Sequence, residues 1–183
     1  MKKYISALTI SFLFLSVSFG QKVFTKNGHV SFFSKTNMED IKADNNQVLS
    51  VLNTQTGELQ FSLINKGFHF DKALMEEHFN ENYMESEKFP KTTFKGTVNE
   101  IAKIKFTGNG TYPVTVTGDM VMHGVTKKMT ASGKIVVTGG IPSATAKFIV
   151  KLSDFNIEVP KLVKENISQN QEVTVDCVYD QKL

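Results

Sequence analysis

Apolar and polar residues alternate along most of this chain. Leu59, Phe61 and Leu63 are separated by polar residues, and the same pattern runs through residues 112–122 and 173–179. Successive side chains of a β-strand point to opposite faces of the sheet, so this period of two predicts strands that are buried on one face only.

Turn signals rich in glycine, asparagine and proline separate the alternating segments. About eight or nine strands are expected, near residues 30–35, 47–53, 57–64, 93–99, 103–106, 112–122, 129–137, 144–152 and 173–179. An antiparallel sheet of this size hides its edges by closing or by stacking. The pattern therefore predicts an all-β fold, either a barrel or a sandwich.

One segment has helical periodicity instead. Between residue 71 and about residue 83, Leu74, Met75, His78 and Phe79 form one stripe, with glutamates on the opposite side. Asp71 precedes this stripe and is the expected N-cap. A shorter helix is expected near residues 160–166.

The first 20 residues have the features of a secretory signal peptide. Two lysines precede an apolar stretch that ends in small residues. This stretch is shorter than the ~20 apolar residues needed to span a bilayer, and no second long apolar run follows it. We therefore expect residues 21–183 to form a single domain in the periplasm or outside the cell, with no transmembrane span after cleavage.

Charge and cysteine content narrow the function further. All 21 basic residues are lysine; without the two in the leader, 19 remain against 18 acidic residues. This near-neutral balance, without any arginine, argues against a nucleic-acid-binding protein.

Cys177 is the single cysteine of the sequence, so no internal disulfide forms. The alternation around it predicts that its thiol is buried and unreactive.

An eight-stranded barrel either fills its interior with side chains or leaves space for one small ligand. Small residues recur on the predicted apolar face, namely Gly96, Gly118, Ala131, Gly133, Ala144 and Ala146. They predict an apolar lumen suited to a hydrocarbon chain, unless the glycines only let strands bend around a packed core. With an open lumen, Gly118→Phe or Gly133→Phe is expected to block ligand uptake while the barrel still folds.

No motif for catalysis is present. The histidines His29, His69, His78 and His123 match no metal-ligand spacing, and the chain has neither a nucleophile elbow nor a phosphate loop. His123 is expected to face outward or to lie in the turn that follows. A metal-dependent enzyme using His69 or His78 is the weakest of the hypotheses, and no catalytic residue, metal or cofactor is predicted.

Three segments together resemble the YceI-like family of bacterial secreted lipid-binding proteins: residues 78–96, 122–127 and 151–157. The resemblance implies an extended, lipocalin-like antiparallel barrel that encloses a long isoprenoid or acyl chain, with a helix near its mouth. Gly124 in the second segment suits a tight hairpin turn. Leu152 stands where family members often carry arginine, so a preference for a diphosphate head group is not carried over.

These observations lead to one main hypothesis: a non-enzymatic carrier that binds an isoprenoid, quinone, fatty acid or fatty amide in the lumen. Its alternative is an envelope protein–protein interaction module with a packed core, and a homodimer is left open. The residues expected to contact the ligand are Phe61, Leu63, Leu74, Met75, His78, Phe79, Phe94, Phe106, Val116, Met120, Met129, Phe148 and Val175.

Overall fold

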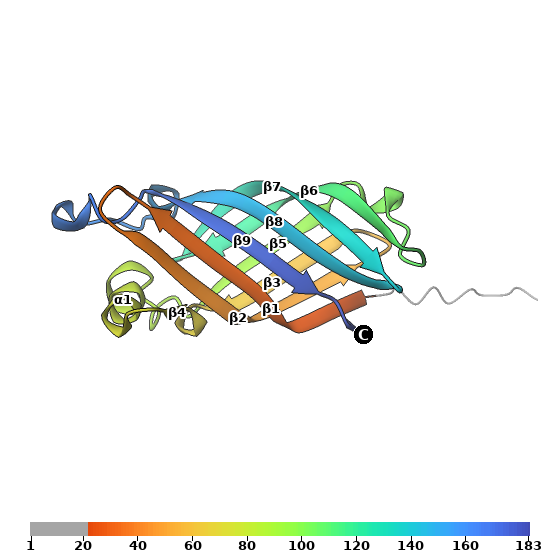
Figure 1. The fold of residues 1–183 in the computed structure, drawn as a ribbon, viewed down its shortest axis with the longest axis horizontal. Coiled ribbons are helices and arrows are strands. Elements are labelled where there is room, and N and C mark those ends of the chain that lie inside the picture. Colours follow the sequence, from red (N-terminus) through yellow and green to blue (C-terminus); the bar gives the residue numbers. More distant parts are fainter. Residues whose placement is uncertain (1–21) are drawn as a thin grey trace, which may run out of the picture.

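The computed structural model describes residues 22–183, so the predicted signal peptide lies outside the described residues. Residues 22–183 form ten strands, eight of them long (Figure 1). Their bounds are β1 Lys22–Lys35, β2 Asp40–Asn53, β3 Glu58–Ile64, β4 His69–Phe70, β5 Lys91–Val98, β6 Gly110–Met122, β7 Val125–Thr138, β8 Ile141–Lys151, β9 Asn170–Val178 and β10 Gln181–Lys182.

The eight long strands close into a barrel. Their order is β1-β9-β8-β7-β6-β5-β3-β2, and β2 pairs with β1 to complete the ring, with every pairing antiparallel. The two-residue strands β4 and β10 lie outside this ring, where β4 pairs with β2 and β10 pairs with β1. The predicted all-β, lipocalin-like antiparallel barrel of about eight strands is confirmed.

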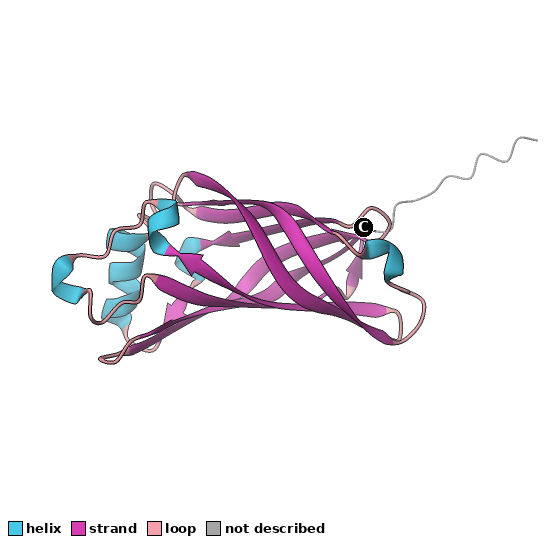
Figure 2. Cartoon of the chain, turned by 90° about the horizontal axis from the view of Figure 1, so that it is seen from above, coloured by secondary structure: helices cyan, strands magenta, loops and turns pink. Residues whose placement is uncertain are grey.

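Most helical segments gather at one end of the barrel, which we call the helical end (Figures 1 and 2). Helix α1 (Ala73–His78) continues into a turn of π-helix, η2 (Phe79–Tyr83), which confirms the helix predicted over residues 71–83. Its N-cap is Lys72, not the expected Asp71. The second predicted helix is one short 3₁₀ turn, η5 (Lys161–Val163). The other 3₁₀ turns are η1 (Asn65–Gly67), η3 (Ile101–Lys103) and η4 (Leu152–Phe155).

Three strand predictions need correction. Residues 103–106 form no strand: Ile104 and Phe106 follow η3 and pack against the core at the other end of the barrel. Their alternation reflects burial of loop side chains and not strand pairing. Strands β1 and β2 are longer than predicted. Alternation did not reveal their first halves because the period of two is broken there, in β1 by register shifts around Gly28 and in β2 by the buried polar residue Asn45.

Opposite the helical end, the barrel is closed by packed side chains. This closed end contains one buried cluster: Val23, Leu52, Leu59, Val98, Ile104, Val114, Ile135, Val137, Cys177 and Tyr179. The Tyr179 hydroxyl is buried there and shares a 2.8 Å hydrogen bond with the Ser50 hydroxyl. Burial raises the pKa of the Cys177 thiol to about 12, in agreement with the predicted unreactive thiol.

At the helical end, the strands separate. β2 pairs with β3 only over Leu49–Leu52, and its earlier residues Ala43 and Asp44 pair with β4. β7 pairs with β8 only from Ser132 onward. Helical segments lie where pairing stops, and Phe155 of η4 is buried in a cluster at this end.

A two-residue hairpin turn, His123 and Gly124, connects β6 to β7 at this end, and both residues have positive φ. The glycine allows the tight bend that was predicted. His123 lies in the turn, but its side chain is only 11 % exposed. Its Nδ1 lies 3.0 Å from the Phe155 carbonyl oxygen and its Nε2 lies 3.0 Å from a Glu85 carboxylate oxygen. His123 therefore connects three loops.

Candidate functional site

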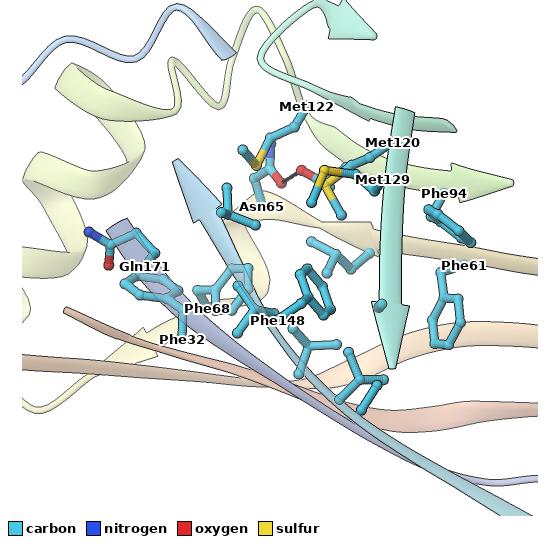
Figure 3. Close-up of a pocket in the computed structure, with 18 of the residues that line it drawn as sticks. Phe32, Phe61, Asn65, Phe68, Phe94, Met120, Met122, Met129, Phe148 and Gln171 are labelled. Atoms are coloured by element: carbon cyan, nitrogen blue, oxygen red, sulfur yellow. Dashed lines mark hydrogen bonds between the residues drawn. The ribbon is translucent and has the colours of Figure 1, made fainter. Parts of the chain in front are cut away.

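The barrel interior contains a cavity of about 440 Å³. All eight long strands contribute to its wall, together with α1, η2 and the segment around η5. The lining side chains are mainly phenylalanine, methionine, valine and leucine, as the close-up in Figure 3 illustrates. Such a wall suits a flexible apolar ligand, because thioether and aromatic groups adapt to irregular shapes.

The cavity has a closed floor and an opening. Its floor is formed by Leu52, Val98 and Tyr179, all fully buried at the closed end. At the helical end, the lining includes the exposed His78 and the partly exposed Met75. We call this opening the mouth.

Eleven of the thirteen residues predicted to contact a ligand line the cavity: Phe61, Leu63, Met75, His78, Phe79, Phe94, Val116, Met120, Met129, Phe148 and Val175. Leu74 and Phe106 are not among the lining residues. Leu74 is 60 % exposed, because α1 turns Met75 and His78 inward and leaves Leu74 on its outer side. Phe106 packs outside the cavity, against the closed-end cluster.

Sequence reasoning missed an aromatic cluster near the mouth. Phe32, Phe68 and Phe70 line the cavity together with Phe79. The Phe79 ring lies 5.6, 5.5 and 5.1 Å from the ring centres of Phe32, Phe68 and Phe70, respectively. Phe68 precedes the two-residue strand β4 and Phe70 lies in it, and a strand of two residues is too short for alternation to indicate a face. Phe32 is followed by another phenylalanine, which obscures the period.

Of the small residues predicted to line the lumen, Ala131, Gly133, Ala144 and Ala146 do so, whereas Gly96 and Gly118 do not. Gly96 and Gly118 face each other across β5 and β6, and the Phe94 ring lies over both. A Cβ atom at Gly118 would lie 2.4 Å from the Gly96 Cα, and one at Gly133 would lie 2.4 Å from the Thr145 carbonyl oxygen. Phenylalanine at either glycine would therefore disrupt strand pairing, so the expectation that such variants still fold is wrong.

Polar groups are few on the wall, and most of them are hydrogen-bonded within the protein; among the described residues, the exception is Gln171, whose Nε2 donates to the Ser168 carbonyl oxygen while its buried Oε1 has no partner. The buried Asn65 donates to the Phe89 carbonyl oxygen at 2.6 Å and accepts from the Thr92 hydroxyl at 2.8 Å. Near the mouth, Glu39 accepts from Lys72 at 2.8 Å and from Asn166 at 3.4 Å. The hydrogen bond from Lys72 lowers the pKa of Glu39, which keeps this carboxylate ionised.

Within residues 22–183, no group of three or more His, Cys, Asp or Glu side chains is placed to hold a metal ion. His69 instead lies 3.5 Å from the carboxylate of Glu76. In the same part of the chain, no helix is long and apolar enough to cross a membrane.

Solved structures share this fold. A polyisoprenoid-binding domain from Saccharophagus degradans, implicated in plant cell wall breakdown, is 13 % identical and superposes with a TM-score of 0.74, covering 87 % of this chain and 97 % of that one. BcnA from Burkholderia cenocepacia is 14 % identical with a TM-score of 0.67, covering 82 % and 95 %. A mutant YceI protein from Campylobacter jejuni is 13 % identical with a TM-score of 0.55, covering 100 % and 99 %.

No curated protein sequence matches this chain. The sequence profile of the YceI-like domain, however, matches residues 12–179, which is nearly the whole chain. With a closed eight-stranded barrel, a helical end and this match in agreement, the chain belongs to the YceI-like domain family.

Proposed function

We propose that this protein is a non-enzymatic carrier that holds one long apolar ligand inside the barrel. The observation that carries the proposal is the cavity of about 440 Å³, which is closed at one end and lined mainly by hydrocarbon, aromatic and thioether groups. Burial of each methylene group contributes about 0.8 kcal/mol, so roughly ten buried groups supply about 8 kcal/mol, which corresponds to micromolar affinity. Such a site needs no polar anchor along most of its length.

The ligand is an isoprenoid, a quinone, a fatty acid or a fatty amide. The similar fold of the Saccharophagus degradans domain, whose description names polyisoprenoid binding, supports an isoprenoid chain. The mouth favours a head group without strong negative charge. Leu152, which lines the cavity, supplies no cation, and the ammonium group of Lys72 near the mouth is already paired with Glu39.

The proposed location is the periplasm or the extracellular space. The basic and apolar pattern of residues 1–20 supports export. A carrier is useful there because an apolar chain of this kind is poorly soluble in the water between membranes.

Extraction of the native protein tests the proposal. The protein is purified from the envelope or medium of its own organism without detergent, extracted with organic solvent, and the extract is analysed by mass spectrometry. We expect about one lipid per protein chain. Absence of lipid, together with failure of the extracted protein to take up long-chain isoprenoids, quinones, fatty acids or fatty amides, would refute the carrier. That result would favour the alternative, a protein–protein interaction module, although such a module was expected to have a packed core and not a cavity.

A further inference from the structure

Three turn or helical segments that border the mouth each expose a large apolar side chain. Met38 is 67 % exposed, Leu74 is 60 % exposed and Leu162 is 96 % exposed. They belong to the β1–β2 turn, to α1 and to η5, respectively. We call these three residues the apolar rim.

Each residue of the apolar rim is followed by a residue that lines the cavity. Glu39 follows Met38, Met75 follows Leu74, and Val163 follows Leu162. Each of the three segments thus contributes to the cavity wall and exposes an apolar side chain to solvent. A ligand that leaves the mouth would meet these exposed side chains next.

The segment η5 projects farthest along the long axis of the barrel, as Figures 1 and 2 show. Leu162 is flanked by the exposed Lys161 and by the exposed Lys164 one turn later. Lysine chains beside an inserted leucine can follow it and keep their ammonium groups at the level of lipid head groups. Glu158 and Glu165 balance these two charges, so attraction to this loop rests on the leucine and not on net charge.

The size of the apolar rim argues for a bilayer and against a protein partner. A buried aromatic side chain removes about 150–250 Å² from water, and each rim side chain is smaller. Three of them fall short of the ~800 Å² that each partner contributes to a stable protein interface, and their exposed neighbours Glu77, Lys161 and Lys164 are charged, a type of residue depleted from interface cores. Insertion of a few side chains between lipid head groups needs no such area.

We propose that the apolar rim docks the mouth onto the surface of a lipid bilayer, so that the ligand passes between membrane and cavity without crossing water. The ligand-transfer part of this proposal rests on the proposed carrier function, whereas docking itself is measured independently of any ligand.

The sequence contains no tryptophan, so a single introduced tryptophan reports its own surroundings. Leu162→Trp places the reporter on the apolar rim. Leu183→Trp is the matched control, because Leu183 is 72 % exposed and the C-terminus lies toward the opposite end of the barrel (Figure 1). On addition of phosphatidylcholine vesicles, we expect emission from the first variant to shift to shorter wavelength and to be quenched by brominated acyl chains. The control should not change.

A second pair of variants measures affinity. Leu162→Asp should weaken vesicle binding at least tenfold in a flotation assay, because it removes one inserted leucine and adds a charge, whereas Leu183→Asp should bind as the wild type does. Binding should persist in 0.5 M NaCl. Leu162 is almost fully exposed, so the variant should melt at the wild-type temperature.

An absent or equal spectral shift at both positions, or equal vesicle binding by both aspartate variants, would overturn the docking proposal. Wild-type protein that docks to vesicles but neither releases lipid on extraction nor takes up added lipid would instead overturn the carrier function and leave docking supported. The two failures are therefore distinguishable.

Discussion

Replacement of Ala131 by phenylalanine is the sharpest test of an open lumen. Ala131 lies on β7, opposite Val116 of β6, and both residues line the cavity. A benzene molecule fits an engineered apolar cavity of about 150 Å³, so the added ring takes up roughly a third of the cavity of about 440 Å³. Unlike the glycines, this position already carries a Cβ atom, so the strand backbone need not move.

The expected effects on binding and on stability have opposite signs. For a ligand with roughly ten buried methylene groups, loss of a third of the space removes about three of them, or about 2.4 kcal/mol, a roughly sixtyfold loss of affinity. In the lipid-free protein, the ring instead fills empty apolar space and should stabilise the fold by about 1–2 kcal/mol. For a domain of this size, that raises Tm by roughly 2–8 °C.

Two measurements check this prediction. Native mass spectrometry compares the lipid retained by wild type and by Ala131→Phe, and thermal unfolding compares the two proteins after lipid extraction. Ala102→Phe is the control, because Ala102 is exposed on η3 at the closed end and should change neither quantity. A variant that keeps wild-type lipid, or whose lipid-free form loses 1–3 kcal/mol as an overpacked core does, would contradict an open lumen at this position.

Three further predictions concern buried side chains at the closed end of the barrel and in the β6–β7 turn. Ser50→Ala and Tyr179→Phe should each cost about 1–3 kcal/mol in urea unfolding, because each leaves a buried hydroxyl unpaired; a double variant that costs the full sum would argue against this coupling. His123→Ala should lose about 2 kcal/mol through its two loop hydrogen bonds, a loss that an unchanged urea midpoint would exclude. Cys177 should resist iodoacetamide at pH 9 until the protein is unfolded, because burial raises its pKa to about 12. The unfolded thiol ionises from about pH 8.5, so wild-type stability should fall relative to Cys177→Ala by about 1 kcal/mol per pH unit between about pH 9 and 12; parallel curves would contradict this.

Alternation by itself determined much of the fold and most of the cavity wall. A period of two assigns each residue of a regular strand to one face, and in a closed barrel the apolar face is the inner one. That is why Phe61, Phe94, Met120 and Phe148 could be placed on the wall from sequence. The same argument failed where the backbone is irregular, as at the loop residue Phe106 and in the short strand beside Phe68.

Only the tertiary structure decided whether the interior is open, where it opens and what surrounds the mouth. An open volume depends on how side chains from eight strands fit together, which the face assignment of each strand does not specify. The glycine pair Gly96 and Gly118 illustrates this, because the Phe94 ring covers both and they leave no free space. The apolar rim likewise joins residues 38, 74 and 162, which come together only because strand pairing ends on one side of the barrel and the loops gather there.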